Sequence, residues 1–344
     1  MRSLYSISRK NLEAFLLQNG YPKYRAIQIF EGLYKQNVSN IDDIKVLKQD
    51  FKEFLKGNFY LNQIRLMGKE ESVDGTVKYL FSLADNHLIE TVLMKHDYGN
   101  SVCISTQVGC NFACAFCASG LLKKQRNLKT DELVLQVKYI NDDLKKKQEK
   151  VSSVVIMGIG EPFDNYDNLL EFLEIVNDSK ALEIGSRHIT VSTVGLVPQI
   201  EKFSTFSLQV NLAVSLHFAS DEKRSKYMPV NRAYNLQALK KTLLKYFVKT
   251  KRRVTIEYIL LKGVNDSIGD AKLLVDFVSG LNCYVNLIPY NQTNSKFERS
   301  EEAKVNEFFK YLKKNKVNVT KRREQGHDIN AACGQLRNKQ IKEV

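Results

Sequence analysis

The stretch SVCISTQVGCNFACAFCASG, residues 101–120, decides how the chain is organised. It begins with a short β-rich run, SVCIST (101–106), and continues into Cys110, Cys114 and Cys117. Because the cysteines follow a predicted strand directly, they are expected on the loop at its end. In parallel α/β folds the loops at the carboxyl ends of the strands build the functional site. The stretch therefore predicts a thiol-lined site on the first strand-end loop of an α/β region.

Downstream of this loop, short β-rich runs alternate with longer amphipathic segments, and Thr130 is a predicted N-cap of the first of these. The further strand candidates are SVVIMG (153–158), HITVST (188–193), VNLAVSL (210–216), VTIEYIL (254–260) and YVNLIP (284–289). Strands that alternate with helices indicate a parallel α/β fold. Six such units favour an incomplete (β/α)6 barrel, and spacing alone leaves an open doubly wound sheet as the alternative.

The first 95 residues follow a different pattern. Up to about residue 60, apolar residues recur at helical spacing, with Lys and Arg between them. The segment GTVKYLFSLADNHLIETVLMK (75–95) then predicts two strands around a turn at Asp85-Asn86. We therefore expect a small helical and β accessory module at 1–95 and a larger unit at 96–344.

Composition indicates a globular protein with a polyanionic partner. Apolar residues make up 43% of the 344 residues, and 52 Lys and Arg against 38 Asp and Glu give a net charge of +14. An excess of this size favours RNA or DNA as the partner, although a lysine-rich background composition would produce it too. The chain contains no apolar run of roughly 18 residues and no signal peptide at its start, so we expect a cytoplasmic protein without a membrane partner.

The cysteine cluster indicates metal chemistry. Each iron of a 4Fe-4S cube needs one outside ligand, so three thiolates satisfy three irons and leave the fourth open. That open iron could chelate the amino and carboxylate groups of S-adenosylmethionine. The alternative is a zinc site with Cys103 or a histidine as the fourth ligand. The spacing Cys-x3-Cys-x2-Cys, with Phe116 before the last cysteine, favours the cluster.

Polar residues at the ends of later strands point to the same edge of the sheet. A glycine turn with an acceptor, Gly158-Ile159-Gly160-Glu161-Pro162, follows the second strand and could bind a ligand amine. Ser192 ends the third strand, Ser215-Leu216-His217 ends the fourth, and Asn291 follows the sixth. Each of these alone is more typical of a turn or cap, so their shared position is the informative feature.

Five segments together resemble one family. HDYGNSVCISTQVGCNFACAFCASG (96–120), MGIGEPFDNY (157–166), RHITVST (187–193), NLAVSLH (211–217) and DINAACGQLR (328–337) are similar to the RlmN/Cfr family of radical S-adenosylmethionine RNA methyltransferases. The resemblance implies a radical SAM partial barrel, here a catalytic core at 96–344 with a C-terminal extension carrying Cys333, and an RNA-binding module at 1–95. For the RlmN branch it implies methylation of C2 of one adenosine in the peptidyl transferase centre of 23S rRNA, and of the adenosine 3′ of the anticodon in tRNA. For the Cfr branch it implies C8 of the same rRNA adenosine.

The resemblance also implies roles for individual residues. One 4Fe-4S cluster per chain would be bound by Cys110, Cys114 and Cys117. S-adenosylmethionine would be contacted by Gly160, Glu161, Ser192, Ser215, Leu216, His217 and Asn291. Cys333 would carry the methyl group, Cys103 would resolve the RNA adduct, and Glu90 would accept a proton. An electron donor such as a flavodoxin or ferredoxin system would reduce the cluster.

The chemistry implied by the family explains why two cysteines outside the cluster are needed. C2 of adenine is electron-poor and has no lone pair with which to attack a sulfonium methyl group. Cys333 would take the methyl group as a nucleophile, and a radical formed on that methyl group would add to C2. Attack of Cys103 on the sulfur of Cys333 would release the product and leave a Cys103–Cys333 disulfide.

Two residues depart from the pattern of the family. Asn330 stands where the family usually has Asp, and Val194 stands where RlmN often has Ser. The segment 228–233 (MPVNRA), in contrast, is more similar to RlmN than to Cfr.

RNA phosphates are expected to contact three basic clusters and the N-terminal helices. These residues are Lys123-Lys124-Arg126, Lys251-Arg252-Arg253, Lys321-Arg322-Arg323, Lys23, Arg25 and Lys35. A zinc-containing RNA-binding protein without catalysis would share the charge and the clustered cysteines, but it would not need the glycine turn or Cys333.

Overall fold

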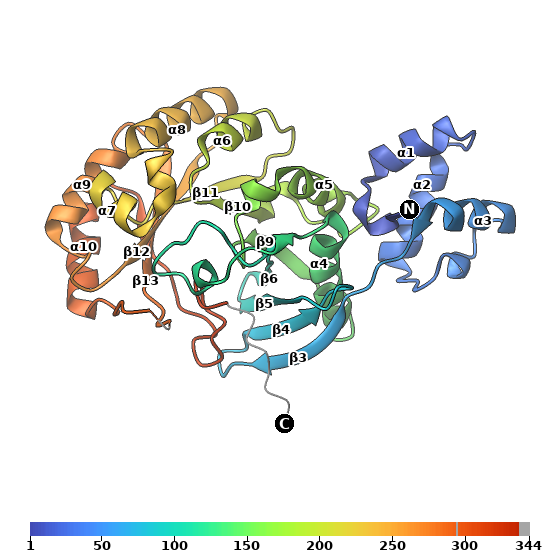
Figure 1. Ribbon diagram of the computed structural model, residues 1–344, viewed down its shortest axis with the longest axis horizontal. Coiled ribbons are helices and arrows are strands. Elements are labelled where there is room, and N and C mark those ends of the chain that lie inside the picture. Colours follow the sequence, from blue (N-terminus) through green and yellow to red (C-terminus); the bar gives the residue numbers. More distant parts are fainter. Residues whose placement is uncertain (294, 337–344) are drawn as a thin grey trace.

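The computed structural model describes residues 1–293 and 295–336, and its central feature is a curved ten-stranded sheet (Figure 1). The strand order is β14-β13-β12-β11-β10-β9-β6-β5-β4-β3. Seven neighbouring strands are parallel: β6 (Gly99–Cys103), β9 (Val151–Ile156), β10 (Ile189–Thr193), β11 (Asn211–Ser215), β12 (Val254–Leu260), β13 (Cys283–Pro289) and β14 (Val319–Lys321). All six strands predicted after residue 100 are therefore confirmed, and β14 is an additional short edge strand.

Helices follow the parallel strands and lie on the outside of the curved sheet (Figure 1). They are α4 (Thr130–Lys145), α5 (Tyr166–Asn177), α6 (Val197–Phe203), α7 (Asp221–Tyr227), α8 (Leu236–Thr250), α9 (Ile268–Val278) and α10 (Glu302–Lys314). A doubly wound sheet would carry helices on both faces. The predicted α/β fold with an incomplete barrel is thus confirmed, and the open-sheet alternative is wrong.

Local sequence explains where these helices begin. At the start of α9, Ser267 Oγ accepts a hydrogen bond from the Asp270 N–H at 3.1 Å, and the Asp270 carboxylate accepts one from the Ser267 hydroxyl at 2.6 Å. Asn235 Oδ1 caps α8 by accepting from the Ala238 N–H at 2.9 Å. Such caps satisfy N–H groups that have no partner within the helix.

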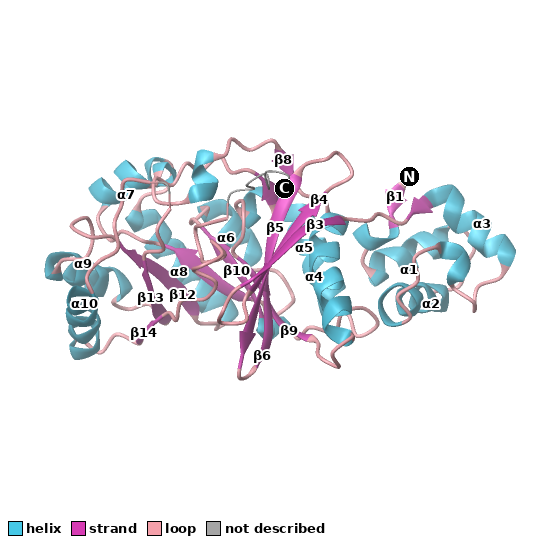
Figure 2. Ribbon diagram, turned by 90° about the horizontal axis from the view of Figure 1, so that it is seen from below, coloured by secondary structure: helices cyan, strands magenta, loops and turns pink. Residues whose placement is uncertain are grey.

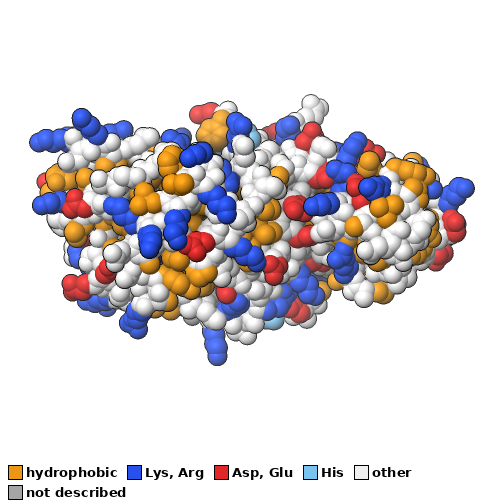
Figure 3. Space-filling model, turned by 90° about the horizontal axis from the view of Figure 1, so that it is seen from above, with side chains coloured by type: hydrophobic (Ala, Val, Ile, Leu, Met, Phe, Trp, Pro, Cys, Tyr) orange, Lys and Arg blue, Asp and Glu red, His pale blue; other side chains and the backbone are white. Residues whose placement is uncertain are grey.

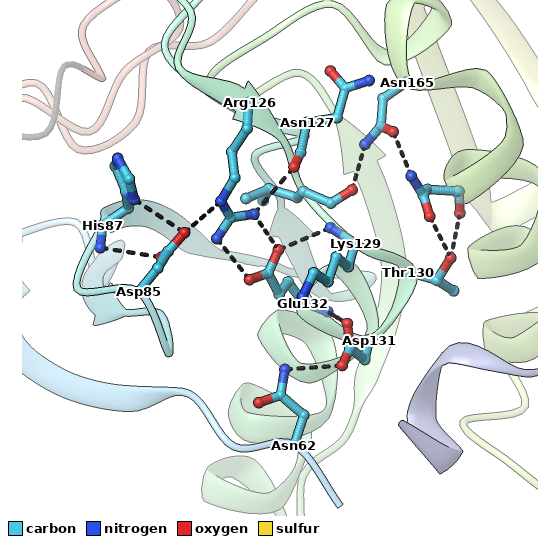
Figure 4. A network of polar contacts seen from close by, with 12 residues as sticks. Asn62, Asp85, His87, Arg126, Asn127, Lys129, Thr130, Asp131, Glu132 and Asn165 are labelled. Atoms are coloured by element: carbon cyan, nitrogen blue, oxygen red, sulfur yellow. Dashed lines mark hydrogen bonds and ion pairs between the residues drawn. The ribbon is translucent and has the colours of Figure 1, made fainter. Parts of the chain in front are cut away.

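The start of α4 belongs to a larger polar network (Figure 4). Arg126, in the short strand β8 (Arg126–Asn127), donates to Asp85 at 2.6 Å and to both carboxylate oxygens of Glu132 at 2.7 and 2.8 Å. Glu132 also accepts from the Lys129 N–H at 2.8 Å, so Lys129 is the N-cap and the prediction of Thr130 was wrong by one residue. The network ties the β4–β5 turn to the segment that returns from the cysteine loop.

Three antiparallel strands extend the sheet beyond β6: β3 (Arg65–Glu71), β4 (Val77–Ser82) and β5 (Leu88–His96). The predicted hairpin turn is present, with Asn86 at φ 64°. β5 is hydrogen-bonded to β6, so these strands continue the sheet of the barrel. The division of the chain near residue 95 stays a prediction, and any boundary there crosses paired strands.

The N-terminal residues form a helical lobe that projects beyond α4 and α5 (Figure 2). It contains α1 (Arg9–Gln18), α2 (Tyr24–Phe30), a π-helical turn at Glu31–Lys35, α3 (Gln49–Asn58) and the paired strands β1 (Arg2–Ser3) and β2 (Phe59–Tyr60). Its contacts with α5 include the Ser8 N–H on Glu171 at 2.6 Å. In the described part of the chain, no helix is long and apolar enough to span a membrane.

Candidate active site

A cavity that is open to solvent on one side lies at the carboxyl ends of the parallel strands. All but two of the predicted site residues line it: Cys103, Cys110, Cys114, Cys117, Gly160, Glu161, Ser192, Ser215, His217, Asn291 and Cys333. The two exceptions are Leu216 and Glu90. The fold therefore brings the ends of β6, β9, β10, β11 and β13, the cysteine loop and the C-terminal segment to one place.

The three loop cysteines share this cavity. Burial, followed by the charges of Cys117 and Cys110, raises the pKa of Cys114 well above its usual value, and burial raises the pKa of Cys110 to about 11. Thiolates in such surroundings need positive charge beside them, which iron ions would supply. The three thiols could thus hold three irons of a 4Fe-4S cluster. Among residues 1–293 and 295–336, no three His, Cys, Asp or Glu side chains lie close enough together to hold a single metal ion.

The glycine turn after β9 packs tightly against the segment that leads to the cysteines. Gly160 has φ +104°, and a Cβ there would lie 2.6 Å from Cβ of Gln107. Gln107 Oε1 accepts from the Glu161 N–H at 2.9 Å, which fixes the two segments to each other. A side chain at position 160 would therefore separate the glycine turn from β7 (Gln107–Val108).

Glu161 is a buried carboxylate that lines the cavity. It accepts from the Phe163 N–H at 3.1 Å and from the Val194 N–H at 2.8 Å, and burial raises its pKa to about 7 despite these bonds. Because Val194 contributes its backbone N–H, this contact does not depend on the side chain at position 194. A ligand ammonium group in the cavity would meet an acceptor whose charge it can stabilise.

Ser192, Ser215 and His217 add polar groups on the neighbouring strands. The two serine hydroxyls are 3.3 Å apart. His217 Nδ1 accepts from the Ile259 N–H at 3.2 Å, and burial, followed by the charge of Arg224, lowers its pKa to about 3. The imidazole is therefore neutral, with its proton on Nε2, and can donate to a ligand.

Leu216 contributes to this region through its backbone. Its side chain is buried, it does not line the cavity, and its N–H donates to the Glu257 carbonyl at 3.1 Å. A side-chain contact between Leu216 and a ligand in the cavity is thus not part of the observed geometry.

The C-terminal segment carries Cys333 into the same cavity. Asn291 Nδ2 donates to the Cys333 carbonyl at 3.1 Å, and the Ala118 N–H donates to the Gly334 carbonyl at 2.8 Å. The buried Asn291 Oδ1 has no hydrogen-bond partner among the described residues, so it offers an acceptor to a ligand. Asn330, where the family usually has Asp, has φ 51°, a conformation that Asn tolerates as Asp does.

Cys103 and Cys333 are both free thiols and lie close enough to interact electrostatically. Burial, followed by the charge of Cys333, raises the pKa of Cys103 to about 12. Burial also raises the pKa of Cys333, and the Arg322 guanidinium opposes this shift through its charge and a side-chain hydrogen bond. Two residues that are distant in sequence thus form a pair beside one cation.

Two residues of the cavity, Arg322 and Glu257, were not predicted from the sequence. Arg322 follows β14, lines the cavity, and lies 3.9 Å from Glu257, although we expected the whole 321–323 cluster to face RNA phosphates. Glu257 is buried in β12, and Asn286 lies 3.1 Å from its carboxylate. The available signal was a lone carboxylate within the apolar strand VTIEYIL.

Glu90 is buried on β5 and does not line the cavity. Its carboxylate is 3.7 Å from Lys78 Nζ. Met94 lies four residues further along β5, on the same face of the sheet, and does line the cavity. The predicted role of Glu90 as proton acceptor stays a prediction.

The partial barrel, its three-cysteine loop and its glycine–glutamate turn define a radical SAM enzyme. Residues 104–274 match the model described as Radical SAM superfamily, and residues 3–61 match the one described as Ribosomal RNA large subunit methyltransferase N-terminal domain. The chain is 50% identical over 342 residues to a probable dual-specificity RNA methyltransferase RlmN of Staphylococcus saprophyticus, covering 99% of this chain and 94% of that protein. It belongs to the RlmN family.

Two further relatives agree. A probable dual-specificity RNA methyltransferase RlmN of Staphylococcus aureus is 50% identical over 340 residues, covering 98% of this chain and 93% of that protein. The crystal structure of a radical SAM methyltransferase from Sphaerobacter thermophilus superimposes with a TM-score of 0.92 at 39% identity, covering 98% of this chain and all of that one. Fold and family are thereby shown over nearly the full length.

Proposed function

We propose that this protein methylates C2 of an adenosine in the peptidyl transferase centre of 23S rRNA and of the adenosine 3′ of the anticodon in tRNA. The observation that carries the proposal is the shared cavity: Cys103 and Cys333 line it together with the three loop cysteines. The relatives named as dual-specificity RNA methyltransferases support the RNA range.

The cavity residues fit the cofactors that this chemistry requires. One 4Fe-4S cluster would be held by Cys110, Cys114 and Cys117. S-adenosylmethionine would be contacted by Gly160, Glu161, Ser192, Ser215, Leu216, His217 and Asn291. When bound, the two supply the methyl group and the one-electron chemistry that an electron-poor carbon needs. The unpartnered Asn291 Oδ1 and the ammonium-accepting Glu161 are where this chain would fix the orientation of the second cofactor.

Cys333 acts first in the proposed sequence, because a thiolate must take the methyl group before it can be passed on. Asn291 holds the backbone of Cys333, and Arg322 provides the cation that favours its ionised form. Once the one-electron chemistry that the bound cofactors would supply had removed one hydrogen atom from the methyl group, its carbon would bond to C2 and join RNA and protein through a thioether. Loss of the C2 proton, with one electron returned to those cofactors, would restore the aromatic ring.

Release requires Cys103 and a proton acceptor. Glu90 would take the C2 proton, and the thiolate of Cys103 would attack the sulfur of Cys333. The sulfur–carbon bond breaks, its electron pair goes to the carbon, and that carbon takes a proton to become the methyl group. The Cys103–Cys333 disulfide that remains is reduced before the next turnover.

The proposed partners are 23S rRNA, tRNA and an electron donor such as a flavodoxin or ferredoxin system, and the proposed location is the cytoplasm. The helical lobe matches a domain described for ribosomal RNA methyltransferases, which supports a role in RNA binding. Lys and Arg side chains are scattered over the face seen in Figure 3 and do not gather in one patch. The net charge alone therefore does not locate the RNA, and the cavity, which Arg322 and Arg323 both line, is the better guide.

The alternatives are separated by one experiment. C8 methylation would use the same cavity residues, and a zinc-containing RNA-binding protein would use none of them for catalysis; no relative reported above is named for either. We expect that expression in a bacterial strain without its own enzyme restores 2-methyladenosine in 23S rRNA and tRNA, measured by mass spectrometry of nucleosides. Formation of 8-methyladenosine would show the Cfr activity, and no methylation by a protein with an intact cluster would contradict the proposed substrate.

A further inference from the structure

The segment that carries Cys333 has no regular secondary structure of its own. From Arg322 to Leu336 the backbone forms only turns and irregular stretches. Cys333 must nonetheless meet a methyl donor, an RNA base and Cys103 in turn if the proposed function is right. A segment without internal hydrogen-bond ladders can be held in place only by contacts with the rest of the protein.

One half of the segment is held by the cavity itself. Residues 332–336 are bound to the cysteine loop and to the end of β13, for example by the Ser119 hydroxyl on the Leu336 carbonyl at 2.8 Å and by Gln335 Nε2 on the Gln292 carbonyl at 2.8 Å. These contacts follow Cys333 or lie beside it. The approach from β14 has contacts of its own: the Arg322 N–H donates to the Leu287 carbonyl at 2.8 Å, and Gln325 Nε2 donates to the Lys95 carbonyl at 3.0 Å.

The part between these contacts, residues 326–329, is held by the β3–β4 hairpin. The Ser72 hydroxyl donates to Asp328 Oδ1 at 2.5 Å, and the Val73 N–H donates to Asp328 Oδ2 at 3.2 Å. The Gly326 N–H donates to Asp74 Oδ2 at 2.9 Å. Three bonds thus join the hairpin turn to two positions that shortly precede Cys333.

Two further contacts join the hairpin to the same segment. Lys78 Nζ donates to the Ile329 carbonyl at 2.6 Å. Gly326 has φ +65°, and a Cβ there would lie 2.8 Å from both Ala331 Cβ and Thr76 Cγ2, so the segment lies directly on the hairpin. Next to these bonds, Ile329, Ala331 and Leu336 of the segment belong to a small apolar cluster separate from the main core. Its other members are Val92, Met94, Cys103 and Ile159.

We infer that the β3–β4 hairpin is a clasp that positions Cys333, with Ser72, Asp74 and Asp328 as its positioning residues. None of the three lines the cavity, so they act through the segment and not on substrate. The inference rests on the proposed role of Cys333 as methyl carrier. It also gives β3, β4 and their turn a function distinct from RNA binding.

The test compares Asp328→Ala and Ser72→Ala with a matched control on the same hairpin. Lys69→Met is the control, because Lys69 contacts Asp143 on α4 and no residue of the segment. Asp328→Asn is the conservative variant, because its amide oxygen can still accept from one donor. Each protein is purified without oxygen, with the visible absorbance of its cluster recorded, and two quantities are measured. These are the rate of Cys333 methylation, from peptide mass spectrometry, and hydrogen–deuterium exchange over residues 326–336.

Removing two hydrogen bonds to a carboxylate should slow Cys333 methylation roughly tenfold and speed exchange of the segment by a similar factor. We expect Asp328→Asn to recover part of the loss and Lys69→Met to match the unaltered protein. Faster exchange without slower methylation would refute the positioning role, and unchanged exchange would refute the clasp itself. If Cys333 of the unaltered protein carries no methyl group, the proposed function fails, while exchange still decides whether the clasp exists.

Discussion

Replacing Glu161 by Gln tests two properties of this buried carboxylate, namely its hydrogen bonds and its charge. In the structure, each carboxylate oxygen of Glu161 accepts from a backbone N–H, that of Phe163 or of Val194. Gln offers one acceptor oxygen and one NH2 group, so one N–H would face a donor in place of an acceptor. The substitution keeps the size of the side chain while it removes a hydrogen bond and the charge.

The effect of this change on the free energy of unfolding depends on pH. Burial raises the pKa of Glu161 to about 7 from 4.5, so the folded state favours the protonated carboxyl group. The contribution of Glu161 to stability is therefore fully present below pH 4.5 and is lost as the pH rises through 7, by roughly 3 kcal/mol at most. The lost hydrogen bond costs the variant about 1–3 kcal/mol. We expect Glu161→Gln to be less stable than the unaltered protein at pH 5, and the difference to shrink or reverse at pH 8.

The effect on cofactor binding has the opposite dependence on pH. A ligand ammonium group needs the ionised carboxylate, so S-adenosylmethionine should bind the unaltered protein more weakly as the pH falls below 7. A charge-assisted hydrogen bond contributes about 1.5–3 kcal/mol, so the variant should bind roughly tenfold to a hundredfold more weakly at pH 8, with little dependence on pH. Isothermal titration with S-adenosylmethionine, together with urea unfolding at both pH values, measures the two effects. Equal affinity of both proteins at pH 8 would refute the assignment of Glu161 as the ammonium acceptor.

Three further predictions concern residues around the site. Arg322→Met should slow alkylation of Cys333 by iodoacetamide roughly tenfold at pH 8, because the thiolate loses its neighbouring cation; an unchanged rate would mean that Arg322 does not favour the ionised form. Gly160→Ala should lower stability by about 2 kcal/mol and abolish S-adenosylmethionine binding, because φ +104° and the 2.6 Å approach of Gln107 exclude a Cβ; a variant that binds normally would show that the turn adapts. Arg126→Met leaves the buried Glu132 carboxylate without its ion pair and should cost about 3 kcal/mol in urea unfolding, whereas a cost below about 0.5 kcal/mol would place this pair among weak surface contacts.

Much of the barrel could be predicted because its strands are rich in β-branched residues and are separated by amphipathic helices. β12 coincides with the predicted VTIEYIL at both ends. The edge strands β3 and β14 could not be predicted in this way. β3 (RLMGKEE) is mostly exposed and carries no alternating apolar face, and β14 has three residues, of which only Val319 is buried. Both are defined by pairing with a neighbour, which is information that the local sequence does not contain.

The candidate site shows the same division. Side chains at strand ends could be placed together from topology, because parallel strands bring their carboxyl ends to one edge. The meeting of Cys103 with Cys333 depends on the path of an irregular segment across the barrel, and sequence gave no distance between them. The inward position of Arg322 was hidden for a related reason: in the basic run 321–323, Lys321 contacts Glu302 and Asn306 outside, while its neighbour lines the cavity.

Trapping the covalent intermediate tests the central claim most directly. Cys103→Ala removes the thiol that would release RNA from Cys333 and leaves the three loop cysteines in place. After anaerobic incubation of the cluster-loaded variant with S-adenosylmethionine, reductant and a 23S rRNA fragment, we expect a protein–RNA adduct. Mass spectrometry should locate its link as one methylene carbon between Cys333 sulfur and C2 of a single adenosine. Release of methylated RNA at the normal rate, or an adduct on another residue, would contradict the account.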